Sequence, residues 1–154
     1  MNIAVRYLSR SGNTEKVARA IAEALGVEAV SIDDPGASVI EKETDILFLG
    51  AAVYAFGIDD EAAAFIQKLD KANVKHAAVF STSALVKSAH SSIKKLLAER
   101  GIPLSDKAFH CWGEFKFTRK GRPNAADLEQ AKAFAREVVL GLENKGNDPP
   151  AKGA

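Results

Sequence analysis

With 154 residues, of which 47% are hydrophobic and 27% charged, the chain is long enough for one domain with a buried core. With a net charge of +1, the composition gives no indication that the chain binds nucleic acid or an anionic membrane. Its one cysteine, Cys111, excludes an internal disulfide and a cysteine-cluster metal site. There is no pattern of a secretion leader and no apolar run of about 18 residues that could cross a membrane, so we expect a cytoplasmic protein.

Five apolar runs of strand length alternate with helical patterns along the chain. We predict strands over residues 3–8, 27–32, 45–51, 76–81 and 107–112. Helices are predicted over 13–25, 59–69, 87–100 and 125–142. The connection over 33–44 contains Pro35-Gly36 and has room for only a short turn of helix. Residues 144–154 are rich in Gly, Pro, Lys and Asn and are predicted to form a disordered tail, which leaves 1–143 as the folded domain.

Nearly continuous apolar strands joined by helical crossovers indicate a parallel sheet with helices on both faces. We therefore predict an α/β fold of three layers, α/β/α, around a doubly wound five-stranded sheet. A phosphate-type turn after the first strand favours the strand order 2-1-3-4-5. In that order the ligand crevice lies outside the carboxyl ends of the first and third strands.

A turn rich in hydroxyls follows the first predicted strand and reads Ser9-Arg10-Ser11-Gly12-Asn13-Thr14. It precedes a helix, whose N-terminus offers unpaired N–H groups and a positive partial charge to an anion. The turn has neither the lysine of a nucleoside-triphosphate loop nor the three glycines of a dinucleotide turn, so it indicates one terminal phosphate of a mononucleotide. Ser, Asn and Thr are also common helix caps, and simple capping is the alternative interpretation.

Two further loops fall at the same predicted edge of the sheet. In the first, Gly50 to Gly57, the rings of Tyr54 and Phe56 either fold back on the protein or are covered by a flat ligand. The second begins at Ser81 and offers hydroxyls and N–H groups to the polar rim of a heterocycle, or else forms an ordinary capped turn.

The order and spacing of these segments resemble those of flavodoxins, in particular short flavodoxin-like proteins of bacteria and archaea. Residues 9–14 resemble their phosphate loop and Gly50 to Gly57 their first isoalloxazine loop, while Phe80 to Ser83 and Lys120 to Leu128 are similar to segments of one such branch. The resemblance covers essentially the whole folded length. It implies noncovalently bound FMN and electron transfer between protein redox partners.

The cofactor-binding residues that this resemblance implies lie in four segments of the chain. They are Ser9, Arg10, Ser11, Gly12, Asn13 and Thr14; Ala52, Val53, Tyr54, Ala55, Phe56 and Gly57; Ser81, Thr82, Ser83 and Ala84; and Gly113 and Phe115. The last segment, 113–117, either folds over the cofactor or ties down the final helix. No catalytic residue and no metal ligand is predicted, because a flavin itself carries the redox chemistry.

Two other functions stay open at the level of the sequence. One is an FMN-dependent oxidoreductase with its own small substrate, such as a quinone, and the other is a flavin-free interaction module of similar topology. A receiver domain is disfavoured, because Ser9-Arg10 and Ala51-Ala52 stand where it needs acidic residues. Familiar flavodoxins are strongly acidic whereas this chain is nearly neutral, so the resemblance does not identify the redox partner. We expect a monomer.

Overall fold

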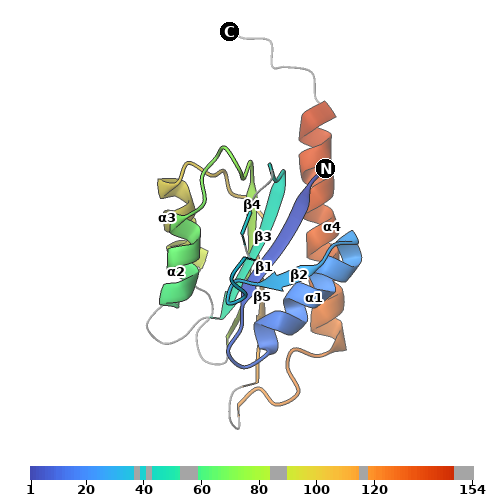
Figure 1. Cartoon of the computed structure of the whole chain (residues 1–154). Helices are drawn as coiled ribbons and strands as arrows, with labels where there is room; N and C mark the ends of the chain where they lie inside the picture. Colours follow the sequence, from blue (N-terminus) through green and yellow to red (C-terminus); the bar gives the residue numbers. More distant parts are fainter. Residues whose placement is uncertain (37–38, 41–42, 53–58, 84–89, 115–117, 148–154) are drawn as a thin grey trace.

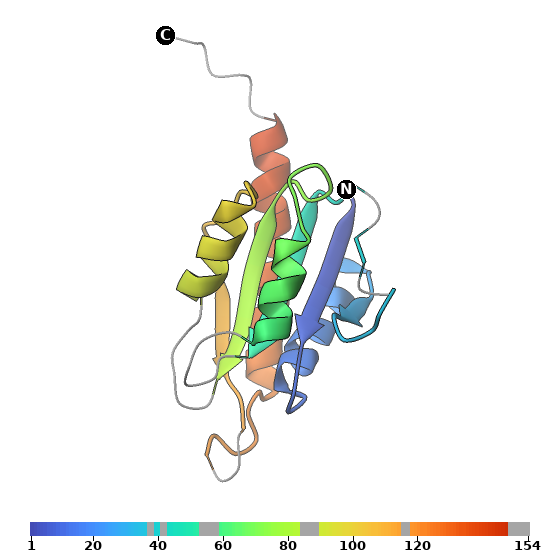
Figure 2. The same ribbon diagram turned by 60° about the vertical axis from the view of Figure 1, so that its left-hand side comes forward.

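The computed structural model describes residues 1–36, 39–40, 43–52, 59–83, 90–114 and 118–147. Within them the elements are β1 (Ile3–Leu8), α1 (Asn13–Leu25), β2 (Ala29–Ser31), β3 (Ile46–Ala52), α2 (Asp60–Gln67), β4 (Ala77–Ser83), α3 (His90–Glu99), β5 (Phe109–Trp112) and α4 (Ala125–Asn147). The strands form one parallel sheet in the order β2-β1-β3-β4-β5. Helices α1 and α4 cover one face and α2 and α3 the other (Figures 1 and 2). The predicted fold class and strand order are confirmed.

Each face of the sheet has its own apolar core, because successive side chains of a strand point to opposite faces. Phe48 and Phe80 belong to the core under α1 and α4, where Phe134 of α4 meets Phe48 edge-on with 6.0 Å between ring centroids. Leu49 and Val79 belong to the core under α2 and α3. With helices packed on both faces, the loops at the strand ends are the natural place for a ligand.

The bounds of β1 and α1 are as predicted, whereas β2 and β5 are shorter than predicted. Gly26 ends α1 in the left-handed region at φ 69°, and the Val27 N–H donates to the Ala22 carbonyl at 3.0 Å. Val27 therefore belongs to the end of the helix rather than to a strand. Near β5, the Lys107 N–H donates to the Ser105 hydroxyl in a turn, and the strand begins only at Phe109.

Other element bounds also differ from the predictions. Strands β3 and β4 run on to Ala52 and Ser83, and α2 begins at Asp60 because Asp59 is its N-cap. Helix α4 extends to Asn147, so residues 144–147, which we expected in a disordered tail, are helical. The rest of that tail and the predicted start of α3 at 87–89 lie outside the described residues. The described residues of the 33–44 connection form turns and no helix.

The segment before α4, which the sequence singled out as Lys120 to Leu128, is held by a cluster of polar bonds. The Asp127 carboxylate accepts from the Arg122 guanidinium at 2.5 and 2.7 Å and from the Asn124 N–H at 2.8 Å. The Asn124 side chain in turn accepts from the Asp127 N–H at 2.9 Å. Bonding to Arg122 lowers the pKa of Asp127. This reciprocal capping fixes where α4 begins.

Gly50 of β3 gives a sharp test of the packing between β3 and β4. It lies beside Phe80 in the sheet, and a Cβ atom added there would stand 2.0 Å from the Phe80 ring. We expect Gly50→Ala to lower the free energy of unfolding by about 1–3 kcal/mol, the usual cost of overpacking a core. Urea denaturation measures this loss.

Gly141→Ala is the matched control, because that glycine lies in α4 with no atom within 4 Å of an added Cβ. It should leave the stability unchanged or raise it by about 0.5–1 kcal/mol, since alanine favours a helix over glycine. Equal effects of the two substitutions would contradict the packing of Gly50 against Phe80.

Candidate functional site

The turn between β1 and α1 lies at the carboxyl edge of the sheet and leaves the start of α1 without a side-chain cap. Gly12 is the N-cap residue and adopts φ 90° and ψ −5°, in the left-handed region that favours glycine. The Ser9 hydroxyl accepts from the Gly12 N–H at 3.0 Å and so closes the turn rather than capping the helix. Because Gly12 has no side chain to accept from the first helical turn, the capping interpretation of this segment is wrong for its N-cap position.

A buried pair of hydroxyls ties this turn to the neighbouring strand end. Thr14 Oγ1 and Thr82 Oγ1 lie 2.8 Å apart, and both side chains are buried. They come from the first turn of α1 and the end of β4, 68 residues apart in the chain. The structure therefore brings together two of the segments that the sequence assigned to one site.

The third segment, at Gly113, joins the same cluster through Asn13. The Asn13 side-chain amide donates to the Glu114 carbonyl at 2.8 Å. A Cβ atom on Gly113 would stand 2.6 Å from Nδ2 of Asn13, so the absence of a side chain at Gly113 leaves room for this amide. The Gly113 N–H donates to the Ser83 carbonyl at 2.9 Å, and the Glu114 N–H to the Arg122 carbonyl at 2.8 Å. Gly113 and Glu114 thus connect α1, β4 and the segment before α4. This agrees with the interpretation that the 113–117 segment ties down the final helix.

The end of β4 carries three consecutive hydroxyl residues, Ser81, Thr82 and Ser83, all buried. The Ser83 hydroxyl lies 2.6 Å from His110 Nε2 of β5. The Ser81 hydroxyl is the buried polar side-chain atom that has no hydrogen-bond partner within the described part of the chain. A buried hydroxyl without a partner costs free energy, so this one is a candidate for a bond to a bound polar group.

Arg10, although predicted to bind the cofactor, directs its guanidinium toward acidic side chains. It donates to both carboxylate oxygens of Asp59 at 3.1–3.3 Å and lies 3.3 Å from Glu61 and 3.9 Å from Asp33. Hydrogen bonds to Asp59 and then Glu61 raise the pKa of Arg10. The sequence did not indicate this arrangement, although Arg10 and the acidic residues beside Asp59 both fall at the carboxyl edge of the predicted sheet.

Several of the predicted site residues lie outside the described residues, and their roles stay predictions. They are Val53, Tyr54, Ala55, Phe56, Gly57, Ala84 and Phe115. Ala52 is the last residue of β3 and pairs in register with Thr82 of β4, so β3 ends beside the hydroxyl residues 81–83. Ser11 is exposed at the tip of the first turn.

Other chemistry finds no support among the described residues. No group of three or more His, Cys, Asp and Glu side chains is placed there to hold a metal ion. Cys111 is buried in the core under α4, and burial raises the pKa of its thiol to about 12, so it is not an activated nucleophile. Within the same residues, no helix combines the length and apolar character that a membrane span requires.

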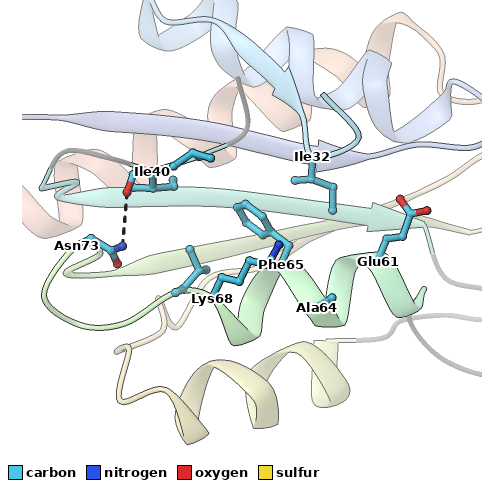
Figure 3. A pocket seen from close by; sticks show the side chains of 9 residues that line it. Ile32, Ile40, Glu61, Ala64, Phe65, Lys68 and Asn73 are labelled. Carbon is cyan, nitrogen blue, oxygen red and sulfur yellow. Dashed lines mark hydrogen bonds between the residues drawn. The ribbon is translucent and has the colours of Figure 1, made fainter. Parts of the chain in front are cut away.

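A cavity of about 330 Å³ lies between α2 and the connection that follows β2 (Figure 3), and its lining includes Glu61, which contacts Arg10. Its walls include Ile32, Ile40, Phe65 and Lys68, and none of its lining residues is among the predicted site residues. We place the functional site at the carboxyl edge instead, because the hydroxyls and the uncapped helix converge there.

Comparison with known proteins agrees with this placement. Residues 4–113 match the flavodoxin domain family, a range that contains the 9–14 turn, β3 and the hydroxyl end of β4. The chain belongs to the flavodoxin family. It is also 30% identical over 137 residues to an uncharacterised protein of Methanocaldococcus jannaschii, an alignment covering 82% of this chain and 90% of the relative.

Solved flavodoxins share the fold over nearly their whole length. A flavodoxin from the domain Archaea superposes with a TM-score of 0.68 at 19% identity, covering 93% of this chain and 99% of the other. Flavodoxin 1 of Bacillus cereus gives a TM-score of 0.68 at 24% identity, with 91% and 98% covered. The rubredoxin oxygen:oxidoreductase of Desulfovibrio gigas gives 0.78 at 18% identity, covering 96% of this chain but 37% of that larger protein.

The family implies a flavin cofactor, and the described residues fit one. The flavodoxin fold places the uncapped N-terminus of α1, which suits an anion, beside Thr82 at the end of β4, whereas the partnerless Ser81 hydroxyl points to the opposite face of the sheet. The donors are backbone N–H groups and neutral hydroxyls rather than lysines. Family and fold together support flavin binding and electron transfer as the general function.

The Thr14–Thr82 pair of this flavodoxin-like site predicts a non-additive stability effect. Thr14→Val or Thr82→Val alone leaves one buried hydroxyl without its partner and should lower the free energy of unfolding by about 1–3 kcal/mol. The double variant T14V/T82V removes both hydroxyls and should cost clearly less than the sum of the single losses. Urea denaturation of the three variants provides the cycle.

Ser91→Ala, at an exposed position of α3, is the control and should change the stability by less than about 0.5 kcal/mol. If the losses at Thr14 and Thr82 are additive, the two hydroxyls do not act as a pair.

Proposed function

We propose that this chain binds FMN noncovalently at the carboxyl edge of its sheet and carries electrons between protein redox partners. The observation that carries the proposal is the start of α1, where the N-cap residue is a glycine at φ 90° and offers no side chain to the first turn. The N–H groups of a helix start need acceptors, and a phosphate supplies several at once.

The phosphate would be held by neutral donors of this chain. These donors are the backbone N–H groups at the start of α1 and the hydroxyls of Ser9, Ser11 and Thr14, all within the 9–14 segment. Thr14 is held in place by Thr82, so its position does not depend on the ligand. Such fixed donors require little reorganisation when an anion arrives, which favours affinity.

The ring system would lie next to the ends of β3 and β4. Ser81, Thr82 and Ser83 provide hydroxyls and backbone groups there, and the segment containing Val53, Tyr54, Ala55, Phe56 and Gly57 would supply the apolar cover. A flavin supplies reversible redox chemistry when bound, while this chain would bind it, orient it and exclude water. The hydroxyl of Ser81, which has no partner among the described residues, would gain an acceptor or donor in this arrangement.

An electron carrier agrees better with the described site than an enzyme with its own substrate does. The side chains of residues 9–14 and 81–83 include one ionisable group, Arg10, and its charge is directed at carboxylates. A flavin-dependent enzyme commonly adds a side chain for proton transfer. The ionisable groups that contact these segments, His110 at Ser83 and Asp59 and Glu61 at Arg10, already take part in hydrogen bonds or ion pairs of the fold.

Purified protein should show the visible absorption bands of a bound flavin, or gain them on incubation with FMN. Gly12→Asp should reduce FMN affinity roughly 100-fold, because its carboxylate would face the phosphate at short range. The variant should still fold, because an added Cβ meets no atom within 4 Å and a non-glycine residue in the left-handed region costs only about 1–2 kcal/mol. Fluorescence titration with FMN and circular dichroism give the two readouts.

Gly26→Asp is the matched control at the other end of α1. Gly26 also has a positive φ, 69°, and no atom within 4 Å of an added Cβ. This variant adds the same charge and similar backbone strain but should bind FMN like the parent protein. FMN binding by Gly12→Asp at the parent affinity, or a folded parent protein that does not bind FMN, would refute the proposal.

A further inference from the structure

The cavity between α2 and the connection after β2 has apolar side chains on both sides. Those that the structure describes are Ile32, Val39 and Ile40 from the connection, and Ala64, Phe65 and Leu69 from α2 and the turn after it. Figure 3 shows the Phe65 side chain directed from α2 toward the side where Ile32 and Ile40 lie. The volume of about 330 Å³ is at the lower end of the range of ligand pockets, so the cavity suits a small molecule.

The apolar walls are open to solvent above and closed by the core below. Val39 is 52% exposed, and Ile32 and Phe65 are half-buried. Ile40 and Leu69 are buried and belong to the core under α2 and α3. The described residues of the connection form turns and no helix that would cover these side chains. Apolar side chains gathered around an open cavity are typical of a binding site.

Two of the three polar side chains in the described lining are held by other residues of the chain. Glu61 lies 3.3 Å from Arg10. The Asn73 side-chain amide donates to the Ile40 carbonyl at 3.5 Å, and its oxygen accepts from the Asp70 N–H at 3.1 Å. Asn73 therefore fixes the wall at Ile40 against the turn after α2, so this side of the cavity is formed before a ligand arrives.

Lys68, the third polar residue, differs from the other two. It is the C-cap of α2 and forms no ion pair with another residue in the described part of the chain. Figure 3 shows its amino group beside Phe65 on the cavity wall. The apolar stem of a lysine lies along such a wall while its ammonium group stays at the rim. One cation at the rim of an apolar cavity favours a ligand with an apolar body and one negative charge.

We infer that this cavity binds a small aliphatic carboxylic acid, with its hydrocarbon chain between Phe65 and Ile40 and its carboxylate at Lys68. A monoanion fits better than a phosphate dianion, because Lys68 also faces the partial negative charge at the end of α2 and can offset only one charge of a ligand. This inference does not depend on the proposed FMN function.

Octanoate is the probe, and methyl NMR of the protein reports where it binds. The methyl signals of Ile32, Ile40 and Leu69 should shift on titration, while that of Val138, in the core on the other face, should stay in place. Affinity should fall about threefold to fourfold for each methylene removed in hexanoate and butyrate, since each one buries less apolar surface. Octylamine, with the opposite charge, should bind about tenfold more weakly than octanoate.

Lys68→Gln tests the charge. It should weaken octanoate about threefold to fivefold, which is the scale of an exposed ion pair, and should leave the affinity for neutral octanol unchanged. Lys71→Gln is the matched control, because Lys71 is exposed in the turn after α2, does not line the cavity and removes the same charge. It should leave the affinity for octanoate unchanged.

Ala64→Trp tests the cavity itself. Ala64 is an exposed residue of α2 that lines the cavity, so a large side chain there fills the space without entering the core. Octanoate should bind at least about tenfold more weakly, since the apolar space is occupied. Gln67→Trp, exposed on the same helix and outside the lining, is the control and should bind octanoate like the parent protein.

Several results would overturn the inference. They are octanoate that leaves the methyls of Ile32, Ile40 and Leu69 unshifted, octylamine that binds as tightly as octanoate, and equal effects of Lys68→Gln and Lys71→Gln. Shifts of the same methyls with protein concentration alone would show that a second copy of the chain covers this face, and would overturn it as well. The prediction for octanoate is the same whether or not the protein takes up FMN, so failure of one proposal does not imply failure of the other.

Discussion

The contact on which the candidate site depends is the buried hydrogen bond between Thr14 and Thr82. It joins the first turn of α1 to the end of β4 across the face of the sheet, with both hydroxyls out of water. A hydroxyl pair of this kind has a defined length and direction, whereas apolar packing alone would let the helix slide along the strand ends. The donors at the start of α1 are therefore fixed relative to the edge where β3 and β4 end.

Two further contacts extend this arrangement on either side. Toward β5, Asn13 donates to the Glu114 carbonyl, and Gly113 gives the Asn13 amide the space it needs. Toward α2, Arg10 reaches Asp59. Arg10, Asn13 and Thr14 stand within five residues of each other, so a single stretch of sequence contacts the start of α2, the segment after β5 and the end of β4. An anion at the start of α1 would be held by helix N–H groups rather than by excess cationic side chains, as we propose for the phosphate of FMN.

Much of the fold could be predicted from the sequence because apolar periodicity reports burial directly. The runs that became β3 and β4 are buried on both faces and stand out as nearly continuous apolar segments, whereas β1 is half-buried at Ile3, Ala4 and Arg6. The errors fall where local hydrogen bonds decide the bounds, as at Val27, where the end of α1 takes a residue that apolar character assigned to a strand. Residues 144–147 were also misjudged, since their polar composition is equally typical of an exposed helix end.

The site was predictable in its location but not in its bonds. Motif order placed residues 9–14 and 81–83 at one edge, and the phosphate-type turn after the first strand favoured the strand order that the structure has. The pairing of Thr14 with Thr82 and of Arg10 with Asp59 depends on side-chain directions over long sequence separations, which no local pattern encodes. Arg10 shows the consequence: its place in the turn suggested a cofactor contact, whereas its charge is directed at the start of α2.

Amide NMR can show whether the start of α1 receives the phosphate of FMN. On titration of the ¹⁵N-labelled protein with FMN, the amides of Gly12, Asn13 and Thr14 should shift most strongly among those of α1. The amides of Val74 and Leu104, at the amino edge of the sheet, should stay in place. Saturating FMN that leaves Gly12 to Thr14 unshifted, or that shifts the amino edge instead, would contradict the account.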